Sequence, residues 1–169
     1  LGTVIASSDG QSLTGLWFEG QKYECSFVED PVLDDSLPLW KNVKHALEEY
    51  FQGVGDVAPA VPIAFVGGTA FQKAVWDVLT EIPYQTVWTY KDVAERIGEK
   101  LGRKTSSRAV GTAIGRNPIS LFVPCHRVVA TTGALTGYAG GVERKRALLT
   151  LEGHSVVKDR VMKGERHEA

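Results

Sequence analysis

One short segment, residues 123–128 with the sequence Val-Pro-Cys-His-Arg-Val, constrains the fold of this chain more than any other. The mostly apolar residues 119–123 lead into it and end at Pro124. An apolar run that stops at a proline predicts a buried strand ending there, because proline has no amide hydrogen to donate to a sheet. Cys125 would then lie at a strand end, where functional groups are commonly presented.

Cys125 and His126 place a thiol directly next to an imidazole. A neighbouring histidine or cationic side chain lowers the pKa of a thiol and makes it a stronger nucleophile, and Arg127 is adjacent as well. The pattern favours a catalytic Cys-His pair. The alternative is that Cys125 is a small buried apolar residue, as most single cysteines are.

Charge is divided unevenly along the chain, although the total is only −1. Residues 1–68 contain ten acidic and three basic residues, a net charge of −7. Residues 69–169 contain sixteen basic and ten acidic residues, a net charge of +6, and residues 100–142 contain six basic residues and no acidic one. A basic second half predicts binding to a polyanion. An ordinary surface with uneven charge is the alternative.

Composition excludes several other classes of protein. The 43% of hydrophobic and 23% of charged residues are typical of a globular protein, and no apolar run is long enough to cross a membrane. The two cysteines, Cys25 and Cys125, are too far apart to suggest a disulfide framework or a zinc ribbon. We therefore expect a reducing, cytoplasmic location, no membrane and no metal. Because the chain begins at Leu1 rather than Met, we also expect residues before it.

Periodicity and turn residues predict an α/β (α+β) fold that divides near residue 67. Residues 1–67 predict a small sheet-plus-helix scaffold domain with strands over 3–6, 13–18 and 23–28, a helix over 40–51 and an extended connector over 53–68. Residues 68–153 predict a mostly helical domain. Its first helix follows the N-cap Thr69, and its last, over 143–151, is expected to pack through Ala147, Leu148 and Leu151. The polar, aperiodic residues 154–169 predict a flexible tail.

The second domain contains a predicted helix-turn-helix at about residues 90–116. Its helices cover 90–98 and 106–115 and are joined by a turn rich in Gly, Lys and Ser. The second helix has an inner face and an opposite, outer face, the first formed by Ala109, Val110, Ala113 and Ile114 and the second by Arg108, Gly111, Thr112 and Gly115. One arginine among very small residues predicts close approach to a narrow DNA groove. Packing on another protein element through the glycines is the alternative.

These segments resemble the O6-alkylguanine-DNA alkyltransferases, also called methylated-DNA–protein-cysteine methyltransferases. The resemblance runs in order over residues 68–153, and its most specific part is Pro-Cys-His-Arg-Val over 124–128. It extends through Gly-Thr-Ala-Phe-Gln (68–72), Val75-Trp76, Ile-Pro-Tyr (82–84), Tyr90, Ser-Arg-Ala-Val-Gly (107–111), Asn117-Pro118, Tyr-Ala-Gly-Gly (138–141) and Leu-Glu-Gly (151–153). The first part of the chain matches more loosely. Family members that bind a structural zinc use several cysteines and histidines, and Cys25 and His45 alone cannot form that site.

The resemblance implies a DNA-repair protein that flips O6-alkylguanine, and also O4-alkylthymine, out of duplex DNA. The alkyl group would pass to Cys125, with His126 as proton acceptor, Glu152 orienting the imidazole and Tyr90 donating to a ring nitrogen of the leaving base. Val128, Tyr138, Ala139 and Gly140 would form the base pocket. Arg108 would fill the space left in the duplex, with Tyr90, Ser107, Ala109, Gly111, Thr112 and Gly115 also at the DNA, and Asn117 would brace the turn before the active-site strand.

The expected product is a thioether, which has no good leaving group at neutral pH, so each molecule should react once. We expect no cofactor, double-stranded DNA bound at its minor groove as the partner, and a monomeric protein, at the nucleoid in a prokaryote; cooperative binding to DNA stays open. Two other hypotheses remain. One is a DNA-binding module in which Cys125 is inert, although related non-repairing proteins carry Trp at this position. The other is a Cys-His hydrolase, which would leave the basic stretch over 100–142 unexplained.

Overall fold

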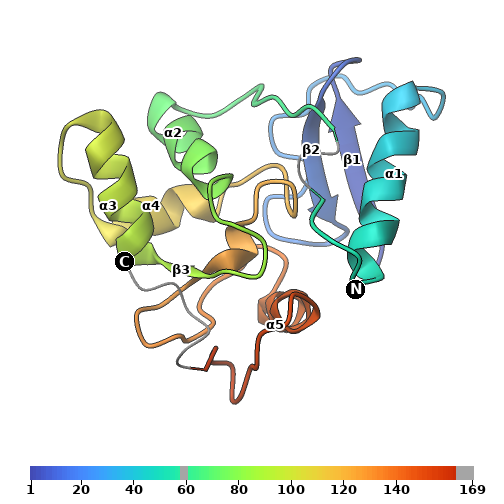
Figure 1. Cartoon of the computed structure of the whole chain (residues 1–169). Helices are drawn as coiled ribbons and strands as arrows, with labels where there is room; N and C mark the ends of the chain where they lie inside the picture. The colour runs from blue at the N-terminus through green and yellow to red at the C-terminus, as the bar shows by residue number, and fades with distance from the viewer. Residues whose placement is uncertain (58–60, 163–169) are drawn as a thin grey trace.

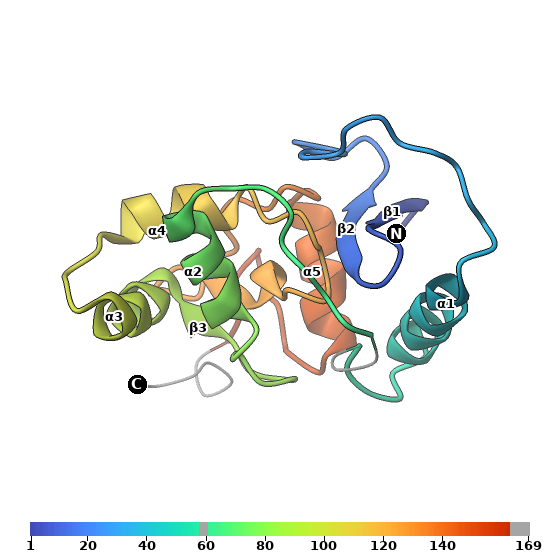
Figure 2. The same cartoon turned by 90° about the horizontal axis from the view of Figure 1, so that it is seen from above.

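The computed structural model describes residues 1–57 and 61–162 and has an α+β architecture, as expected. A two-stranded sheet and one helix, formed by the first part of the chain, stand beside a group of helices formed by the second (Figure 1). Helix α5 (Val142–Leu151) lies between them when the molecule is viewed from above (Figure 2). One hydrophobic core cluster includes residues from both parts, among them Leu16, Tyr50, Trp76 and Val110.

The N-terminal sheet pairs β1 (Val4–Ser8) with β2 (Leu13–Phe18) in antiparallel register, with a bulge between Ser7 and Ser8. All six residues of β2 are buried, and Leu13, Leu16 and Phe18 belong to the core cluster. Helix α1 (Pro38–Phe51) begins with a proline, whose missing amide hydrogen costs nothing at a helix start. Its buried side is formed by Leu39, Val43, Ala46 and Tyr50.

Two helices of the second part begin at capping boxes that fix where they start. In α2 (Ala70–Leu79) the Thr69 side chain accepts from the Gln72 amide, and the Gln72 side chain accepts from the Thr69 amide. The pair β3 (Trp88–Thr89) and β4 (Val128–Val129) is parallel and leads into α3 (Tyr90–Leu101), where Thr89 and Asp92 make the same reciprocal bonds. At its other end α3 runs beyond the expected end at Gly98, which does not have a positive φ, and stops at Gly102, which adopts a left-handed conformation.

Helix α4 (Ser107–Ile114) follows a turn and packs on both α2 and α3. The Ser106 hydroxyl caps it by accepting from the Ala109 amide. Val110, Ala113 and Ile114 are buried as expected. Ala109 is exposed, so its assignment to the inner face was wrong: it lies one residue before the buried position 110, on the side that turns outward.

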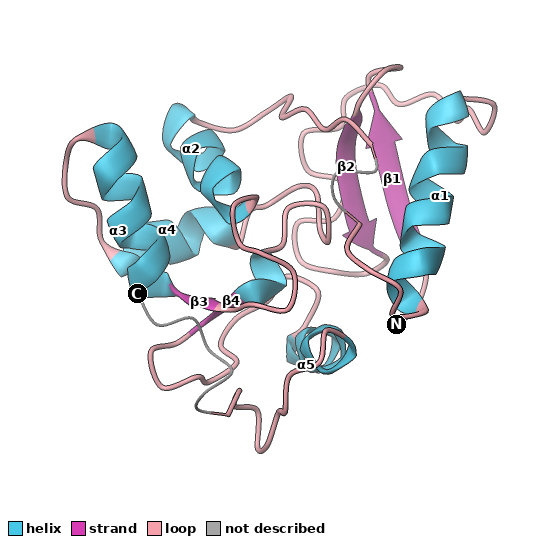
Figure 3. Cartoon of the chain, in the orientation of Figure 1, coloured by secondary structure: helices cyan, strands magenta, loops and turns pink. Residues whose placement is uncertain are grey.

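The strand expected over 119–123 is absent, which corrects the sequence prediction. The side chain of Asn117 captures both ends of this stretch, accepting from the Ile119 amide at 3.0 Å and donating to the Val123 carbonyl at 2.8 Å. Leu121 has a positive φ of 70°, and the backbone amide of Val123 donates to the Ile119 carbonyl. The segment is therefore a compact buried loop, and Figure 3 shows it as loop up to the short 3₁₀ helix Cys125–Arg127.

Residues 23–28 form successive turns instead of the expected third strand. Tyr23, Cys25 and Phe27 all have positive φ, and the amides of Ser26 and Val28 donate to carbonyls three residues earlier. Alternating left-handed residues close local turns, and these are incompatible with an extended strand. The turn brings this segment beside residues 138–140, where the Lys22 amide donates to the Ala139 carbonyl.

The C-terminal segment up to residue 162 is packed and hydrogen-bonded, so the expected flexible tail is wrong for residues 154–162. The Leu135 amide donates to the Asp159 carbonyl and the Val161 amide to the Gly133 carbonyl. Val161 is buried against Val129 and Leu149. The remainder of the predicted tail, 163–169, lies outside the described residues. Helix α5 itself buries Lys145, Leu148 and Leu149, whereas Ala147, expected in the core, is exposed.

Candidate active site

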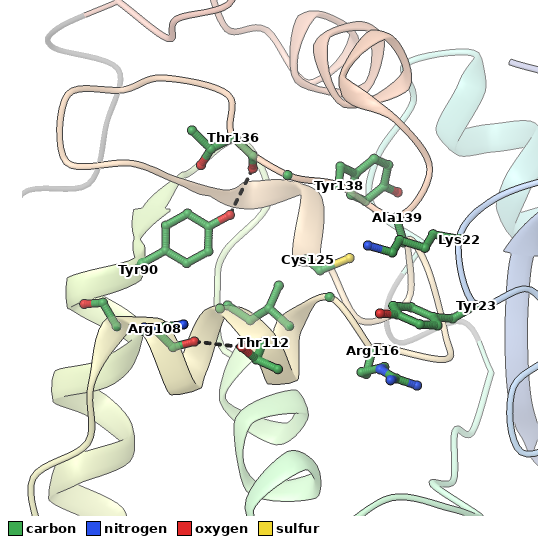
Figure 4. A pocket seen from close by; sticks show the side chains of 15 residues that line it. Lys22, Tyr23, Tyr90, Arg108, Thr112, Arg116, Cys125, Thr136, Tyr138 and Ala139 are labelled. Carbon is green, nitrogen blue, oxygen red and sulfur yellow. Dashed lines mark hydrogen bonds between the residues drawn. The ribbon is translucent and has the colours of Figure 1, made fainter.

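Cys125 lies at the wall of an open cavity of about 690 Å³ that the two parts of the chain form together. It is the first residue of the 3₁₀ helix and is 6% exposed. Figure 4 shows its sulfur among the side chains that line the cavity. Cys25, by contrast, is exposed in the turn over 23–28, and both cysteines are free thiols.

His126, next to Cys125, is fully buried and, within residues 1–57 and 61–162, is hydrogen-bonded through one ring nitrogen only. Its Nε2 lies 2.5 Å from Glu152 Oε2, at the C-terminal end of α5. Since a carboxylate accepts, Nε2 carries the proton and Nδ1 is left as the acceptor of the neutral ring. Nδ1 is buried and has no hydrogen-bond partner among the described residues. This tautomer leaves one imidazole nitrogen available to take a proton.

Glu152 is held in place by three further hydrogen bonds. The Tyr50 hydroxyl donates to Oε2 at 2.5 Å, and Arg127 donates through Nε to Oε1 at 2.8 Å and through a terminal nitrogen to Oε2 at 3.3 Å. Arg127, also buried, is bound in turn by Asp56 at 3.0 Å and by the Ile82 carbonyl at 3.1 Å. A buried carboxylate and a buried guanidinium thus neutralise each other with well-formed bonds.

Burial sets the resting protonation of the pair. It raises the pKa of the Cys125 thiol, although Asn117 and Lys145 partly oppose this. Burial likewise lowers the pKa of His126, against the opposite influence of Glu152. For Glu152, burial would raise the pKa, but His126 and Arg127 hold it well below its usual range. The free protein near neutral pH therefore holds a thiol and a neutral imidazole, and no thiolate–imidazolium pair.

Lys145 is a buried cation close to this pair. Its Nζ donates to the Val128 carbonyl at 2.5 Å and to the Thr136 carbonyl at 3.2 Å. Burial lowers the pKa of Lys145 to about 8. In its charged form it favours the thiolate of Cys125, and its two hydrogen bonds tie the active-site segment to the loop that follows β4.

Tyrosines and glycines close the rest of the cavity. The Tyr90 hydroxyl donates to the Thr136 carbonyl at 3.0 Å, as Figure 4 shows, and burial raises its pKa. Tyr138 and Ala139 line the cavity as expected. The other two residues expected in the pocket, Val128 and Gly140, are buried and are not part of the lining.

Six of the seven residues expected at the DNA gather on this cavity: Tyr90, Ser107, Arg108, Gly111, Thr112 and Gly115. Ala109 borders a separate shallow hollow beside Thr69 and Phe71. A Cβ added at Gly111 would lie 3.7 Å from the Tyr90 ring, so an alanine would fit there in ordinary contact and packing on Tyr90 does not require the glycine.

Sequence reasoning missed residues on both sides of Cys125. Lys22 and Tyr23 line the cavity from the first part of the chain, and the Arg116 guanidinium lies 3.8 Å from the Tyr23 ring centroid. Tyr50, Asp56 and Arg127 come together only in the folded chain. Lys145 was detectable, because it stands three and four residues before Leu148 and Leu149 on the buried face of its helix.

Comparison with known proteins decides the family. Residues 70–154 match the model of the 6-O-methylguanine DNA methyltransferase, DNA binding domain. The methylated-DNA–protein-cysteine methyltransferase of Haemophilus influenzae is 40% identical over 154 residues, covering 90% of this chain and 81% of the relative. The protein of the same name from Methanosarcina acetivorans is 38% identical over 156 residues, covering 90% and 93%. The chain belongs to the methylated-DNA–protein-cysteine methyltransferases.

The solved structures agree with this assignment. Mycobacterium tuberculosis OGT in complex with DNA superposes with a TM-score of 0.73 at 36% identity, over 90% of this chain and 89% of that one. The chain is a DNA-binding repair enzyme of the methyltransferase class, and the group it removes from DNA passes to a cysteine of the protein itself. Over the part that the structure describes, no helix is long and apolar enough to cross a membrane.

Proposed function

We propose that Cys125 is the acceptor cysteine and that it removes the alkyl group from O6-alkylguanine. One observation carries this proposal: Cys125 borders the cavity directly beside a histidine whose only unpaired nitrogen can take a proton. A thiolate is a soft nucleophile suited to attack on an alkyl carbon. In the reaction the Cys125 sulfur bonds to the alkyl carbon, the carbon–oxygen bond breaks, and the oxygen of guanine keeps the electron pair.

His126 and Tyr90 handle the protons of this step. The thiol proton passes to Nδ1 of His126, directly or through a water, while Glu152 holds Nε2 in the required tautomer. Tyr90 donates its hydroxyl proton to a ring nitrogen of the leaving base and regains one from solvent. Its hydroxyl is bound to the Thr136 carbonyl in the free protein, so the base must displace this bond. No second group that could cleave the resulting thioether is part of this scheme, so each molecule reacts once and needs no cofactor.

DNA binds along α4 through the minor groove in this proposal. The small residues Gly111, Thr112 and Gly115 allow the helix to approach closely, and the exposed Arg108 enters the duplex where the base leaves the stack. The helix-turn-helix over 90–116 is then the DNA-reading unit of residues 68–153, while residues 1–67 support it. Asn117 connects this unit to the active site through its two hydrogen bonds.

The same site serves O4-alkylthymine, whose alkyl group is also carried by a ring-attached oxygen. We expect a monomer that works in the cytoplasm, where a reducing environment keeps the Cys125 thiol free. The basic stretch over 100–142 meets the polyanion in this arrangement, and Lys22 brings a positive charge from the otherwise acidic first part to the same cavity.

Intact mass spectrometry tests the proposal. After mixing with a duplex that holds one O6-methylguanine, the protein gains the mass of one methyl group, and peptide mapping finds it on Cys125. An undamaged duplex gives no change, and a further excess of damaged duplex adds no second methyl group.

Two variants serve as matched controls. Cys125→Ser gains nothing, whereas Cys25→Ser, which removes the exposed thiol, gains one methyl group at the wild-type rate. Tight binding of the damaged duplex with no mass change would support the inert-cysteine hypothesis instead. Multiple turnovers with an unmodified protein would support a hydrolase.

A further inference from the structure

Two residues from the first part of the chain reach the carboxylate that orients His126. Tyr50, in the last turn of α1, donates to Glu152 Oε2, the same oxygen that binds His126 Nε2. Asp56, in the connector after α1, binds Arg127, which binds both oxygens of Glu152. Residues 1–67 therefore contribute two hydrogen-bonding groups to the acid–base network, in addition to their packing.

The hydrogen bond from Tyr50 to Glu152 lies inside the buried core of the protein. Tyr50 is 1% exposed, and its hydroxyl reaches across 102 positions of sequence to a carboxylate that is itself fully buried. An apolar residue would fill this core position without a polar atom, whereas a buried hydroxyl destabilises the fold unless it has a partner. The hydroxyl here has a partner, and that partner is the one carboxylate in contact with His126 among the described residues.

We propose that Tyr50 and Asp56 are positioning residues of the alkyl transfer, acting through Glu152 and Arg127 on the nitrogen of His126 that accepts the thiol proton. The proposal rests on the roles of Cys125 and His126 given above. Neither residue borders the cavity, so neither touches the base or the alkyl group.

Their effects on His126 have opposite signs. Tyr50 donates to the oxygen that His126 also uses, so it withdraws negative charge from Glu152, and its loss leaves a stronger acceptor for His126 Nε2–H. A stronger acceptor stabilises imidazolium and raises the pKa of His126. Asp56 offsets the positive charge of Arg127. Without Asp56, less of the positive charge of Arg127 is neutralised. That charge disfavours protonation of the nearby imidazole, so the pKa of His126 falls.

The other charged and titratable groups around His126 stay in place in both variants. They come from the 3₁₀ helix, from α5 and its end, and from the loop before α5: Cys125, Arg127, Lys145, Glu152 and Tyr138. Only neutral His126 can accept the thiol proton, so the acid limb of the pH–rate profile reports the proton affinity of this ring.

The test measures the single-turnover rate of Cys125 alkylation from pH 5 to 9 for the full-length chain. Two substrates are used, free O6-benzylguanine and a duplex with one O6-methylguanine. Tyr50→Phe moves the acid limb to higher pH and slows the reaction about fivefold near pH 6, with rates close to wild type near pH 8. Asp56→Asn moves the acid limb to lower pH. Each shift is the same with both substrates, because neither residue touches DNA.

Tyr84→Phe is the matched control, since the Tyr84 ring lies 5.6 Å from the Arg127 guanidinium and its hydroxyl has no hydrogen bond to Glu152 among the described residues; this variant keeps the wild-type acid limb. Equal slowing of both variants at every pH would overturn the proposal and leave Tyr50 and Asp56 with a structural role. If Tyr50→Phe does not fold, Asp56→Asn still decides, because the Asp56 side chain is 22% exposed and its loss is better tolerated. Failure of the proposed function itself is distinct: wild-type Cys125 would then gain no alkyl group at any pH.

Discussion

The two sides of the cavity around Cys125 are built in different ways. On the inner side, His126, Arg127 and Glu152 are buried and joined to one another by hydrogen bonds of 2.5–3.3 Å. On the outer side, Arg108 and Thr112 are exposed, and among the described residues the Thr112 hydroxyl bonds to the Arg108 carbonyl of its own helix alone. Folding alone completes the inner side, whereas in the proposed function the outer side acquires its partners from DNA. A change to the inner side should therefore affect every substrate, and a change to the outer side only duplex DNA.

The largest effect is expected from Glu152→Gln on the inner side. A neutral amide holds the His126 tautomer less firmly and cannot stabilise imidazolium as the thiol proton arrives. We expect the alkylation rate to fall by roughly 10²–10⁴, the usual contribution of general acid–base catalysis. The fall should be the same with free O6-benzylguanine and with damaged duplex. Glu143→Gln, in the exposed first turn of α5, is the control and should react at the wild-type rate. If the reaction slowed only with duplex DNA, Glu152 would act in DNA binding and not in the proton transfer.

The same variant should also change how stability depends on pH. The pKa of Glu152 in the folded protein lies below its ordinary value of 4.5, so its contribution to stability is present above 4.5 and is lost as the pH falls toward the folded value. The pKa of His126 is also lowered, from 6.5, so protonation of this residue in the unfolded chain favours unfolding below about pH 6.5. Wild-type stability should therefore fall between pH 6.5 and 3. In Glu152→Gln the part of that fall below pH 4.5 should be smaller, as urea denaturation at several pH values would measure.

The outer side is tested by Arg108→Ala. An arginine that fills the space left by the extruded base stabilises only the flipped complex, so its loss should slow reaction with duplex about 10–100-fold, or roughly 1.4–2.8 kcal/mol. Reaction with free O6-benzylguanine should change by less than about twofold. Lys104→Ala removes one positive charge from the turn between α3 and α4 and separates general attraction to DNA from insertion into the duplex. Equal slowing by both variants would leave Arg108 as an ordinary phosphate contact.

The features that could be predicted from the sequence are those formed by residues close together in the chain. The capping boxes at Thr69 and Thr89 involve residues three apart, and the helices begin where the sequence predicted. The Cys-His pair is adjacent in sequence, and six of the seven expected DNA residues line the cavity because most of them share one helix. These features needed only short-range spacing.

The incorrect expectations concern contacts between distant residues or side chains that override local propensity. The apolar stretch 119–123 has a strand-like composition, but the Asn117 side chain binds two of its backbone groups and closes it into a loop. Residues 154–162 lack periodicity, yet they bond to the backbone near Gly133 and Leu135. Likewise, no spacing rule connects Tyr50 to Glu152, since the contact exists only after both parts of the chain have packed.

The smallest effect, and the sharpest test of the outer side, is expected from Gly111→Ala. The new Cβ would lie 3.7 Å from the Tyr90 ring, an ordinary contact, and the helix should gain up to about 1 kcal/mol because alanine replaces glycine in its interior. Reaction with free base should be unchanged. Reaction with duplex should slow about threefold, because one added methyl group keeps α4 slightly farther from the groove, a cost of the size expected for a mild steric change. Thr112→Ser, which removes a methyl group from the same face, should not slow it. If Gly111→Ala were both more stable and equally fast on duplex, the approach of α4 to DNA would not depend on a glycine at this position.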